Sequence, residues 1–170
     1  MLFRSYEFKP GELTDLPQVY DIIDERIHWM DQVGIKQWNV TDYWDCYPES
    51  YYKKAVSNGN LYVLKRKDTG LVASVAVLYE EDARWQAKQG PAAYYVHHLA
   101  TRLGEKGAGK VMVDCCEKLA AARGKEYLRL DCAIDNPKIN AYYDGLRYDY
   151  AGTCVDGKYE GNLREKRVEQ

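Results

Sequence analysis

The spacing of apolar residues predicts one strand and two helices in the first third of the chain. Residues 2–8, LFRSYEF, alternate between apolar and polar side chains, as a strand with one buried face does. Apolar residues then recur every three or four positions between Thr14, a favourable N-cap, and Gly34, a common helix end. The apolar face of this helix consists of Leu16, Val19, Tyr20, Ile23, Ile27 and Met30. A second helix is predicted at residues 48–57, after an aromatic-rich loop at residues 34–44.

The middle of the chain predicts strands on either side of an amphipathic helix. Two apolar runs flank the turn residues 67–70, KDTG, which is typical of a β-hairpin. Residues 80–91 are polar and predict a loop, and residues 93–101, AYYVHHLAT, predict the fourth strand. Apolar positions at helical spacing follow from 111 to 122. Residues 127–133, YLRLDCA, predict the fifth strand.

The C-terminal part predicts a short helix and a final pair of strands. The helix is expected at residues 137–146, and the strands at residues 148–155 and 161–168 with a turn near residues 156–157. The strand–helix–strand unit at the centre of the chain should form a right-handed parallel crossover, with the rest of the sheet antiparallel. We therefore expect an α+β fold in one domain, residues 1–170: a mixed, mostly antiparallel sheet of about seven strands flanked by helices.

Composition narrows the possible classes of protein. Hydrophobic residues make up 46% of the chain and charged residues 29%, which is typical of a globular protein. The formal charge of −2 disfavours nucleic-acid binding through a broad basic surface. The sequence contains no apolar run near the ~20 residues of a membrane span, and its N-terminus has no apolar stretch typical of a signal peptide. We therefore expect a cytoplasmic protein without a membrane or nucleic-acid partner.

The cysteines and histidines do not form a metal-binding pattern. Five cysteines include no C-x-x-C pair, and His28, His97 and His98 are not at zinc-ligand spacing from them. Reduced, buried thiols and no metal are therefore expected. The 16 tyrosines, against two phenylalanines, have two interpretations. They fit a partly hydrated core, which we expect for most of them, or a polar aromatic pocket for a small ligand.

The segment GEKGAGKV, residues 104–111, has the spacing of a phosphate-binding loop. As G-x-x-x-x-G-K it resembles a nucleotide triphosphate loop, and Asp131 at the end of an apolar strand resembles a magnesium-positioning carboxylate. That loop requires Ser or Thr after the lysine to bind magnesium, and this chain has Val111 there. A dinucleotide motif is also disfavoured, because Met112 stands in place of the third glycine.

The properties that these loops share are nevertheless present. Glycines let the backbone approach a ligand, and the N-terminus of the following helix carries a partial positive charge. Lys106 and Lys110 add full charges. The loop should bind an anion, and phosphate is the expected one.

Over essentially its whole length the sequence resembles the GNAT superfamily of N-acetyltransferases, and three segments carry this resemblance. HHLATRLGEKGAGKVMVDCCEKL is similar to the family's acetyl-CoA motif, Q/R-x-x-G-x-G/A, with Gly107 and Gly109 at the glycine positions and Gly104 in place of Gln or Arg. NPKINAYYDGLRYDYAG is similar to N-P-x-x-x-A-x-Y-x-x-x-G-F/Y, with Arg147 in place of glycine. The matching positions of this second motif are Asn136, Ala141, Tyr143 and Tyr148. TDLPQVYDIIDERIHWMDQVGIKQW resembles the acceptor-side helices of small bacterial members.

The resemblance implies acetyl-CoA as the donor and direct acetyl transfer to the amine of a small molecule or amino acid, and it suggests a homodimer. The residues that it implies for acetyl-CoA are Leu99, Ala100, Thr101, Gly104, Lys106, Gly107, Ala108, Gly109, Lys110, Asn136 and Tyr143. Loop amides at 107–110 would hold the pyrophosphate, and the edge of the fourth strand at 99–101 would pair with the pantetheine amides. Asn136 would bind the pantetheine arm, and Tyr143 would protonate the CoA thiolate.

The base and the acceptor pocket are less well defined by the sequence. His97 and His98 lie on the strand expected to face the reaction, on opposite sides of it, and either suits a base near neutral pH. Carboxylates at 80–82 could instead act through water. The candidates to line the acceptor pocket are Trp29, Gln37, Trp38, Tyr43 and Trp85, each of which also suits a core or dimer contact. Two alternatives remain open: a non-catalytic acyl-CoA-binding sensor with this fold, and a nucleotide triphosphate enzyme.

Overall fold

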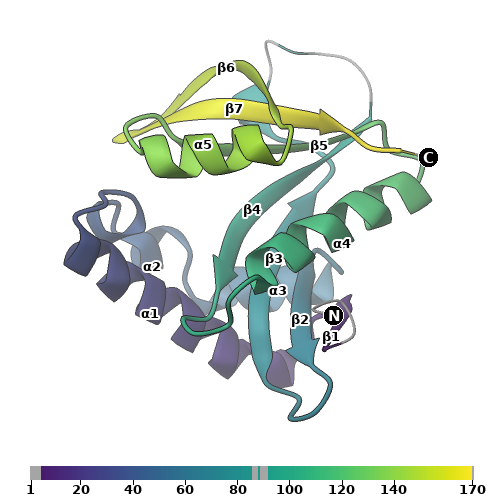
Figure 1. The fold of residues 1–170 in the computed structure, drawn as a ribbon. Coiled ribbons are helices and arrows are strands. Elements are labelled where there is room, and N and C mark those ends of the chain that lie inside the picture. The colour runs from purple at the N-terminus through teal and green to yellow at the C-terminus, as the bar shows by residue number, and fades with distance from the viewer. Residues whose placement is uncertain (1–4, 86–87, 89–91, 170) are drawn as a thin grey trace. The chain divides into compact units, whose positions relative to one another are not determined.

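Helices and strands follow one another in nearly the expected order in the computed structural model, which describes residues 5–85, 88 and 92–169 (Figure 1). The strands are β1 (Tyr6–Pro10), β2 (Leu61–Arg66), β3 (Val72–Tyr79), β4 (Ala93–Thr101), β5 (Tyr127–Ala133), β6 (Asp149–Asp156) and β7 (Tyr159–Arg167). The α-helices are α1 (Leu16–Val33), α2 (Tyr43–Cys46), α3 (Glu49–Ser57), α4 (Ala108–Ala122) and α5 (Pro137–Gly145). Single 3₁₀ turns are η2 (Leu13–Asp15), η3 (Trp38–Val40) and η4 (Ala83–Trp85).

The strands form one mixed sheet in the order β1-β2-β3-β4-β5-β7-β6. The pairs β1–β2, β2–β3, β5–β7 and β6–β7 are antiparallel. Strands β4 and β5 are parallel, with Ala93 opposite Tyr127 and Tyr95 opposite Arg129, and α4 connects them. This confirms the expected α+β fold with a central strand–helix–strand unit. Among the described residues, no helix is long and apolar enough to cross a membrane.

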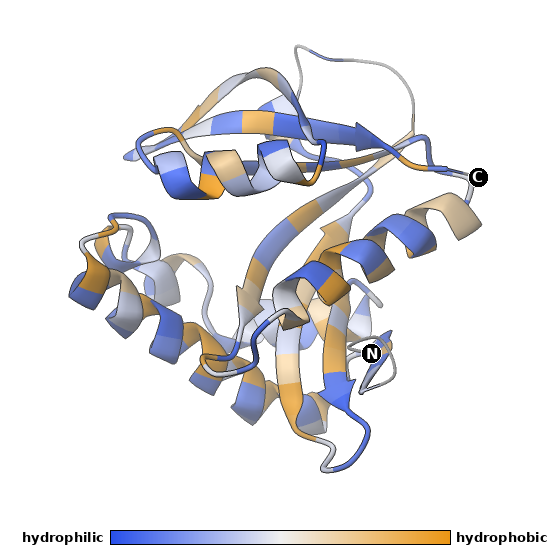
Figure 2. Ribbon diagram, in the orientation of Figure 1, coloured by the Kyte–Doolittle hydropathy of each residue, from blue (hydrophilic) through white to orange (hydrophobic). Residues whose placement is uncertain are grey.

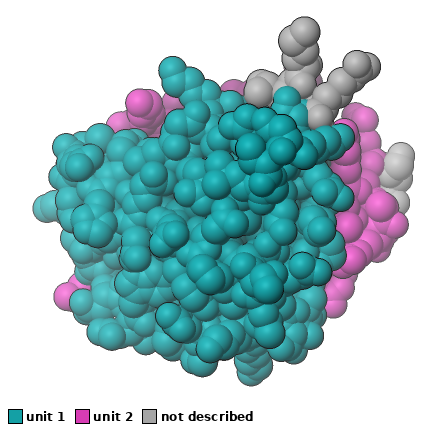
Figure 3. All heavy atoms as spheres, turned by 90° about the horizontal axis from the view of Figure 1, so that it is seen from below, with its two compact units in different colours: residues 1–78, 97–115 teal, residues 79–96, 116–170 magenta. Residues whose placement is uncertain are grey.

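The chain divides into two compact units, coloured separately in Figure 3. Unit 1 comprises residues 1–78 and 97–115, and unit 2 comprises residues 79–96 and 116–170. Both β4 and α4 contribute to each unit, because the boundaries fall within them. In unit 1, fully buried side chains of α1, β2 and β3 make the core; they include Val19, Ile22, Ile23, Val63 and Val75. In unit 2, Trp85, Ala93, Tyr95, Cys154 and Leu163 form a buried cluster.

Helix α1 begins and ends through local backbone interactions. At its start, the N–H of Asp15 donates to the carbonyl of Glu12 at 2.9 Å, and the Asp15 carboxylate accepts from the N–H of Glu12 at 2.9 Å. The prediction of Thr14 as the N-cap was therefore wrong. The two hydrogen bonds between Glu12 and Asp15 set the start, and Thr14 lies within η2. The prediction of Gly34 as the end is confirmed, because it adopts the left-handed conformation at φ 77°. Hydrophobic and hydrophilic residues alternate along α1 in Figure 2.

Several predicted boundaries differ from those observed. Strand β1 begins at Tyr6, whereas residues 2–4 of the predicted strand lie outside the described residues. The aromatic segment predicted as a loop contains η3 and the start of α2. The final hairpin is confirmed. Its second strand, β7, begins at Tyr159 and not at the predicted position 161, because the left-handed Gly157 makes the turn tighter than expected. Part of the predicted loop at 80–91, namely residues 86–87 and 89–91, also lies outside the described residues.

Truncation of a core side chain in α1 should show how much this helix contributes to stability. Ile22 has an exposed fraction of 0%, so Ile22→Ala should lower the free energy of unfolding by about 2–5 kcal/mol through lost burial and a residual cavity. Val33 on the same helix is 50% exposed, and Val33→Ala should change stability by less than about 0.5 kcal/mol. Urea denaturation measures both values, and equal losses in the two variants would contradict the assigned burial.

Candidate active site

Strand β4 departs from extended geometry at one residue, His98. Its φ of 54° lies in the left-handed region, which residues other than glycine seldom occupy. His97, His98 and Leu99 are all half-buried, whereas the four residues of β4 before them are buried. The His97 and His98 rings lie 6.0 Å apart, and the simple expectation of opposite faces does not hold across this irregularity. Strained backbone conformations of this kind persist only where the contacts of the surrounding structure hold them in place, and they cluster at functional sites.

The left-handed backbone places His98 among tyrosines of unit 1. The hydroxyl of Tyr43 lies 2.6 Å from Nδ1 of His98, and it also forms a hydrogen bond with the hydroxyl of Tyr52. The rings of Tyr47 and Tyr51 lie 4.3 and 5.2 Å from the imidazole. Tyr43 is buried, and this burial, reinforced by Tyr52, raises the pKa of the Tyr43 phenol far above its usual range. The phenol therefore stays neutral.

The aromatic residues predicted to line the acceptor pocket fall into different environments. The ring of Trp38 packs 5.1 Å from Tyr43, so it joins the surroundings of His98. Trp29 lies under the guanidinium of Arg26 at 4.9 Å. Trp85, in contrast, is 2% exposed and packs in the core of unit 2. The structure thus brings Trp38 and Tyr43 together with the candidate base.

Gln37 and Asn39 organise the loop that carries Trp38. The backbone N–H of Gln37 donates to Oδ1 of Asn39 at 2.8 Å. The amide of Asn39 donates to Asp31 of α1 at 2.7 Å and to the carbonyl of Ile35 at 2.9 Å. These bonds hold the loop against the end of α1 and so fix the backbone on which Trp38 lies.

The edge of β4 beyond His98 has a defined orientation within unit 1. The carbonyl of Ala100 accepts a hydrogen bond from Ser74 Oγ of β3 at 2.9 Å. Because successive carbonyls of a strand point in opposite directions, those of Leu99 and Thr101 point away from β3. The Thr101 carbonyl accepts from Nε of Arg26 at 2.6 Å. Of the three residues predicted to pair with pantetheine, Leu99 and Thr101 therefore direct their carbonyls to the side away from β3, whereas the carbonyl of Ala100 bonds to Ser74 of β3.

The glycine loop turns directly into α4. Gly104 and Gly107 have φ values of 91° and 82°, which a side chain would disfavour. The N–H of Val111 bonds to the carbonyl of Gly107 at 3.2 Å and marks the first closed turn of the helix. A Cβ on Gly109 would lie 3.0 Å from Thr101 Oγ1, so this glycine lets α4 approach the end of β4 closely. The loop therefore has the conformation of an anion-binding helix start.

The lysines of this loop differ in their surroundings. Lys106 is exposed, whereas Lys110 forms an ion pair with Asp114 at 3.0 Å, one helical turn further on. The full charge expected at Lys110 is therefore partly balanced by Asp114. The sequence does contain a signal for this ion pair, because residues four positions apart lie on the same face of a helix.

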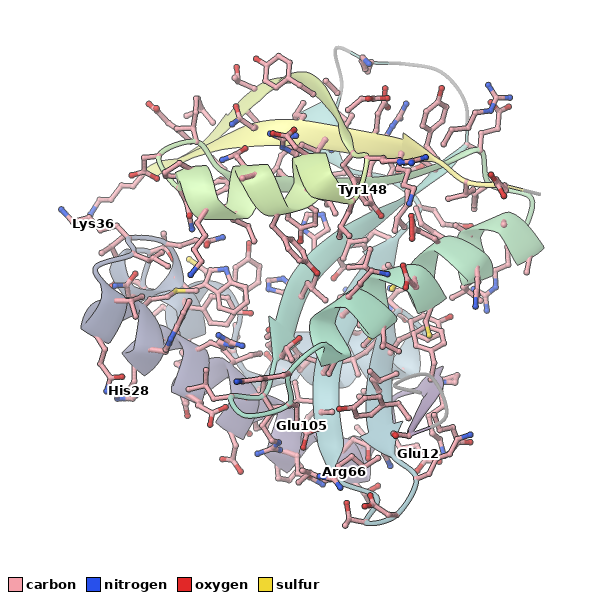
Figure 4. All side chains as sticks on the ribbon, in the orientation of Figure 1. Glu12, His28, Lys36, Arg66, Glu105 and Tyr148 are labelled. Carbon is pink, nitrogen blue, oxygen red and sulfur yellow. The ribbon has the colours of Figure 1, made fainter. Side chains whose placement is uncertain are left out.

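Two acidic residues that the sequence analysis did not identify hold the loop in place. Glu105 accepts a hydrogen bond from the hydroxyl of Tyr6 at 2.6 Å and pairs with Arg66 at 3.3 Å; Figure 4 labels Glu105 and Arg66. Glu25 of α1 accepts from the N–H of Leu103 at 3.0 Å. A glutamate is unexpected in a loop predicted to bind an anion, and this was the signal in the sequence that Glu105 has another role. Its partners were not predictable, because Tyr6 is 99 positions away.

Asn136 and Tyr143 lie in unit 2, at the start and on the buried side of α5. Oδ1 of Asn136 accepts from the N–H of Ile139 at 3.2 Å and caps the helix. Tyr143 is buried against Tyr142 and Tyr148, with ring centroids 5.2 and 5.6 Å away. Burial raises the pKa of the Tyr143 phenol above its usual range, so it carries its proton at neutral pH. Its role as an acid stays a prediction.

Comparisons with known proteins agree with this architecture, although no family model matches the chain. The curated "Uncharacterized N-acetyltransferase YesJ" of Bacillus subtilis (strain 168) is 23% identical over 166 residues, which cover 94% of this chain and 88% of that protein. A GNAT family acetyltransferase from Listeria monocytogenes 4b F2365 is similar in structure, with a TM-score of 0.78 at 19% identity, over 96% of this chain and 95% of that one. The PaiA N-acetyltransferase from Thermoplasma acidophilum, solved in complex with coenzyme A, gives a TM-score of 0.72 at 17% identity, over 96% and 99%.

These similarities establish the class of fold. The chain has the fold of GNAT family acetyltransferases over nearly its whole length, and the proteins that it resembles are N-acetyltransferases. The resemblance found in the sequence is therefore confirmed.

The contact between Tyr6 and Glu105 should appear in the pH dependence of stability. Burial, reinforced by Glu105, raises the pKa of Tyr6 from 10.0 to about 12. A phenol with a raised pKa stabilises the folded state below pH 10, and this contribution is lost as the pH rises from about 10 to about 12. Tyr6→Phe should cost about 1 kcal/mol at pH 7, the value of one hydrogen bond, and the difference from the wild type should shrink above pH 10. Urea denaturation at several pH values tests this; a difference that stays constant would contradict it.

Proposed function

We propose that this protein is an acetyl-CoA-dependent N-acetyltransferase that moves an acetyl group to the amine of a small molecule or amino acid. The observation that carries this proposal is the sequence of features within unit 1: an irregular β4 that holds a histidine, a glycine loop, and the N-terminus of α4. The GNAT fold and the complex of a structural neighbour with coenzyme A support it.

The residues of the loop fit a pyrophosphate. Left-handed Gly104 and Gly107 expose backbone where a side chain would intervene, and the N-terminus of α4 that follows favours a bound anion. The N–H of Ala108 already donates to the carbonyl of Glu105 at 3.2 Å, so the amides of Gly107 and Gly109 would provide most of the contact. Lys106 would add a positive charge at the exposed side.

The extended part of the donor fits the edge of β4. Leu99 offers its backbone on the side away from β3, where the amides of pantetheine would pair as an added strand does, next to the Thr101 carbonyl that accepts from Arg26. Asn136 uses Oδ1 to cap α5, so its Nδ2 would be the group that contacts the pantetheine arm. Glu105 and Glu25 would not contact acetyl-CoA; they would hold the loop in the conformation that binds it.

The reaction requires two proton transfers. When bound, acetyl-CoA supplies the acetyl group as a thioester. The amine must lose a proton as its nitrogen forms the new C–N bond, and His97 or His98 would accept that proton. The sulfur leaves as the C–S bond breaks, and Tyr143 would donate a proton to it. The neutral state of the buried Tyr143 phenol supports this role.

The acceptor would bind beside His98. Trp38 would contribute aromatic surface there, and Tyr43, which is 3% exposed, would support it from behind. Trp29 lies on the same helix as Arg26, which binds β4. The aromatic rings and the acidic residues of α1 and α2 favour a small cationic amine or amino acid. We also expect a cytoplasmic homodimer, an expectation that rests on the resemblance and the composition alone.

Ligand-dependent stability tests the donor. Acetyl-CoA and free CoA at 100 times their dissociation constant should each add about 2.7 kcal/mol to the free energy of unfolding, whereas Mg-ATP should add nothing. A thermal shift assay with the three ligands side by side measures this. Stabilisation by Mg-ATP alone would contradict the proposal and favour a nucleotide triphosphate enzyme.

Substitution of Tyr143 separates an enzyme from a sensor. Tyr143→Phe should lower kcat by about 100-fold or more, the usual contribution of an acid catalyst, while acetyl-CoA still stabilises the protein. The matched control is Tyr142→Phe, which removes the hydroxyl of a neighbour that is 40% exposed and should leave kcat near the wild-type value. Steady-state kinetics measures kcat for both variants and for the wild type. Equal rates in both variants would contradict the role of Tyr143, and binding without turnover in the wild type would favour the sensor.

A further inference from the structure

A continuous chain of hydrogen bonds connects His98 to two buried hydroxyls in unit 1. Nδ1 of His98 lies 2.6 Å from the hydroxyl of Tyr43, and that hydroxyl bonds to the hydroxyl of Tyr52. Tyr43 and Tyr52 are 3% and 0% exposed. A histidine whose first ring nitrogen is held in this way presents its second ring nitrogen in a fixed direction.

We propose that His98 is the base that removes the proton from the acceptor amine, and that Tyr43 is its positioning residue, which holds the imidazole in the tautomer with hydrogen on Nδ1. The inference rests on the proposed function, and it selects one of the two histidines that the sequence and the fold leave open. It also assigns a specific task to Tyr43, which the sequence analysis considered only as a residue of the acceptor pocket.

The direction of the hydrogen bond follows from what a base requires. A neutral imidazole accepts a proton only at the nitrogen without hydrogen. If Nδ1–H donates to Tyr43, then Nε2 keeps its lone pair, and the hydroxyl of Tyr43 can donate onward to Tyr52. Each tyrosine has a single hydroxyl hydrogen, so this arrangement satisfies the chain without conflict. The reverse arrangement places hydrogen on Nε2 and leaves only Nδ1, which is already bonded to Tyr43.

The same hydrogen bond stabilises the product of the proton transfer. The lone pair of the neutral amine attacks the thioester carbonyl; as the C–N bond forms, the N–H bond breaks and its proton forms the new Nε2–H bond, while the C–S bond breaks and the thiolate leaves with the proton that Tyr143 would donate. The imidazolium then donates from Nδ1 to Tyr43, and a hydrogen bond from a charged donor is roughly twice as strong as a neutral one. Because burial keeps the phenol of Tyr43 neutral, it orients the ring without introducing a negative charge.

The other groups around His98 support the fixed position of the ring. Edge-to-face contacts join it to Tyr47 at 4.3 Å, to Tyr51 at 5.2 Å and to Tyr52 at 5.8 Å. The titratable side chains that contact it include four tyrosines, from α2, α3 and the residues between them, and His97 of β4 itself. Since imidazole is the side chain that ordinarily titrates near neutral pH, separate substitution of His97 assigns the pH dependence.

The first test measures the tautomer in the free protein and needs no turnover. Nitrogen-15 NMR distinguishes a ring nitrogen that carries hydrogen from one that does not. The chain has three histidines, so His28→Gln and His97→Gln assign the signals of His98. Neutral wild-type His98 should carry hydrogen on Nδ1. A hydrogen on Nε2, with Nδ1 unprotonated, would overturn the inference.

The second test compares two tyrosine variants. Tyr43→Phe keeps the ring and removes the hydroxyl that contacts His98. Tyr20→Phe is the matched control, because Tyr20 packs on Tyr52 at 5.8 Å while its hydroxyl donates to the carbonyl of Glu49 at 3.5 Å. Tyr43→Phe should lower kcat about tenfold, as expected for the loss of one charge-assisted hydrogen bond, and leave the KM for acetyl-CoA unchanged.

The pH profile gives a readout that a purely structural role would not change. Loss of the acceptor at Nδ1 destabilises the imidazolium, so the pKa of His98 should fall and the acid limb of kcat should move to lower pH in Tyr43→Phe. Tyr20→Phe should retain the wild-type rate and profile. His98→Gln should lower kcat about 100-fold or more and remove the acid limb, whereas His97→Gln should keep it. Identical profiles for the two tyrosine variants, or loss of the acid limb only in His97→Gln, would overturn the inference.

Failure of the proposed function remains distinguishable from failure of this inference. A wild-type protein that binds no acetyl-CoA and acetylates no amine contradicts both, whatever the tautomer of His98. A wild-type protein that acetylates an amine with hydrogen on Nε2 of His98 contradicts the inference alone.

Discussion

The left-handed backbone at His98 is the constraint on which the arrangement of the site depends. A strand with regular alternation would separate His97 and His98 onto opposite faces. The φ of 54° instead places His98 beside the hydroxyl of Tyr43. After this residue the strand resumes, so that Ala100 bonds to Ser74 of β3 while Leu99 and Thr101 offer their backbone groups on the other side. One irregular residue thus gives β4 two roles, to present a side chain and to provide a backbone edge.

The high tyrosine content has a physical explanation in these contacts. Buried tyrosines place aromatic area in the core and supply a hydroxyl that binds a specific partner. Tyr6 binds Glu105 of the glycine loop, Tyr43 binds His98, and Tyr159 binds Asp131 at 2.7 Å. Phenylalanine would fill the same volume without the hydrogen bond and would leave these partners unsatisfied. These contacts agree with the interpretation of the tyrosines as core residues whose hydroxyls bind polar partners, whereas a pocket for a small ligand stays a prediction.

Two carboxylates lie in or next to the glycine loop, where their negative charge would oppose the predicted binding of an anion. Glu105 lies within the loop, yet both of its oxygens are used, one by Tyr6 and the other by Arg66. Glu25 similarly accepts a backbone N–H of the segment that leads into the loop. Arg66 thus balances the charge of Glu105, and both carboxylates hold the backbone that leads into α4. The loop is therefore held by side-chain contacts as well as by its glycines.

The sequence by itself determined the elements and their order. Strands β4 and β5 have the bounds that their apolar runs predicted, and Gly34 ends α1, because periodicity and turn chemistry act over a few neighbouring residues. The glycine spacing likewise predicted the turn from β4 into α4, whose role in anion binding stays a prediction. Only the tertiary structure decided which aromatic residues lie with His98 and which, like Trp85, fill a core. It also decided the left-handed backbone at His98 and the partners of Glu105, since these depend on contacts between segments far apart in the sequence, which no local pattern encodes.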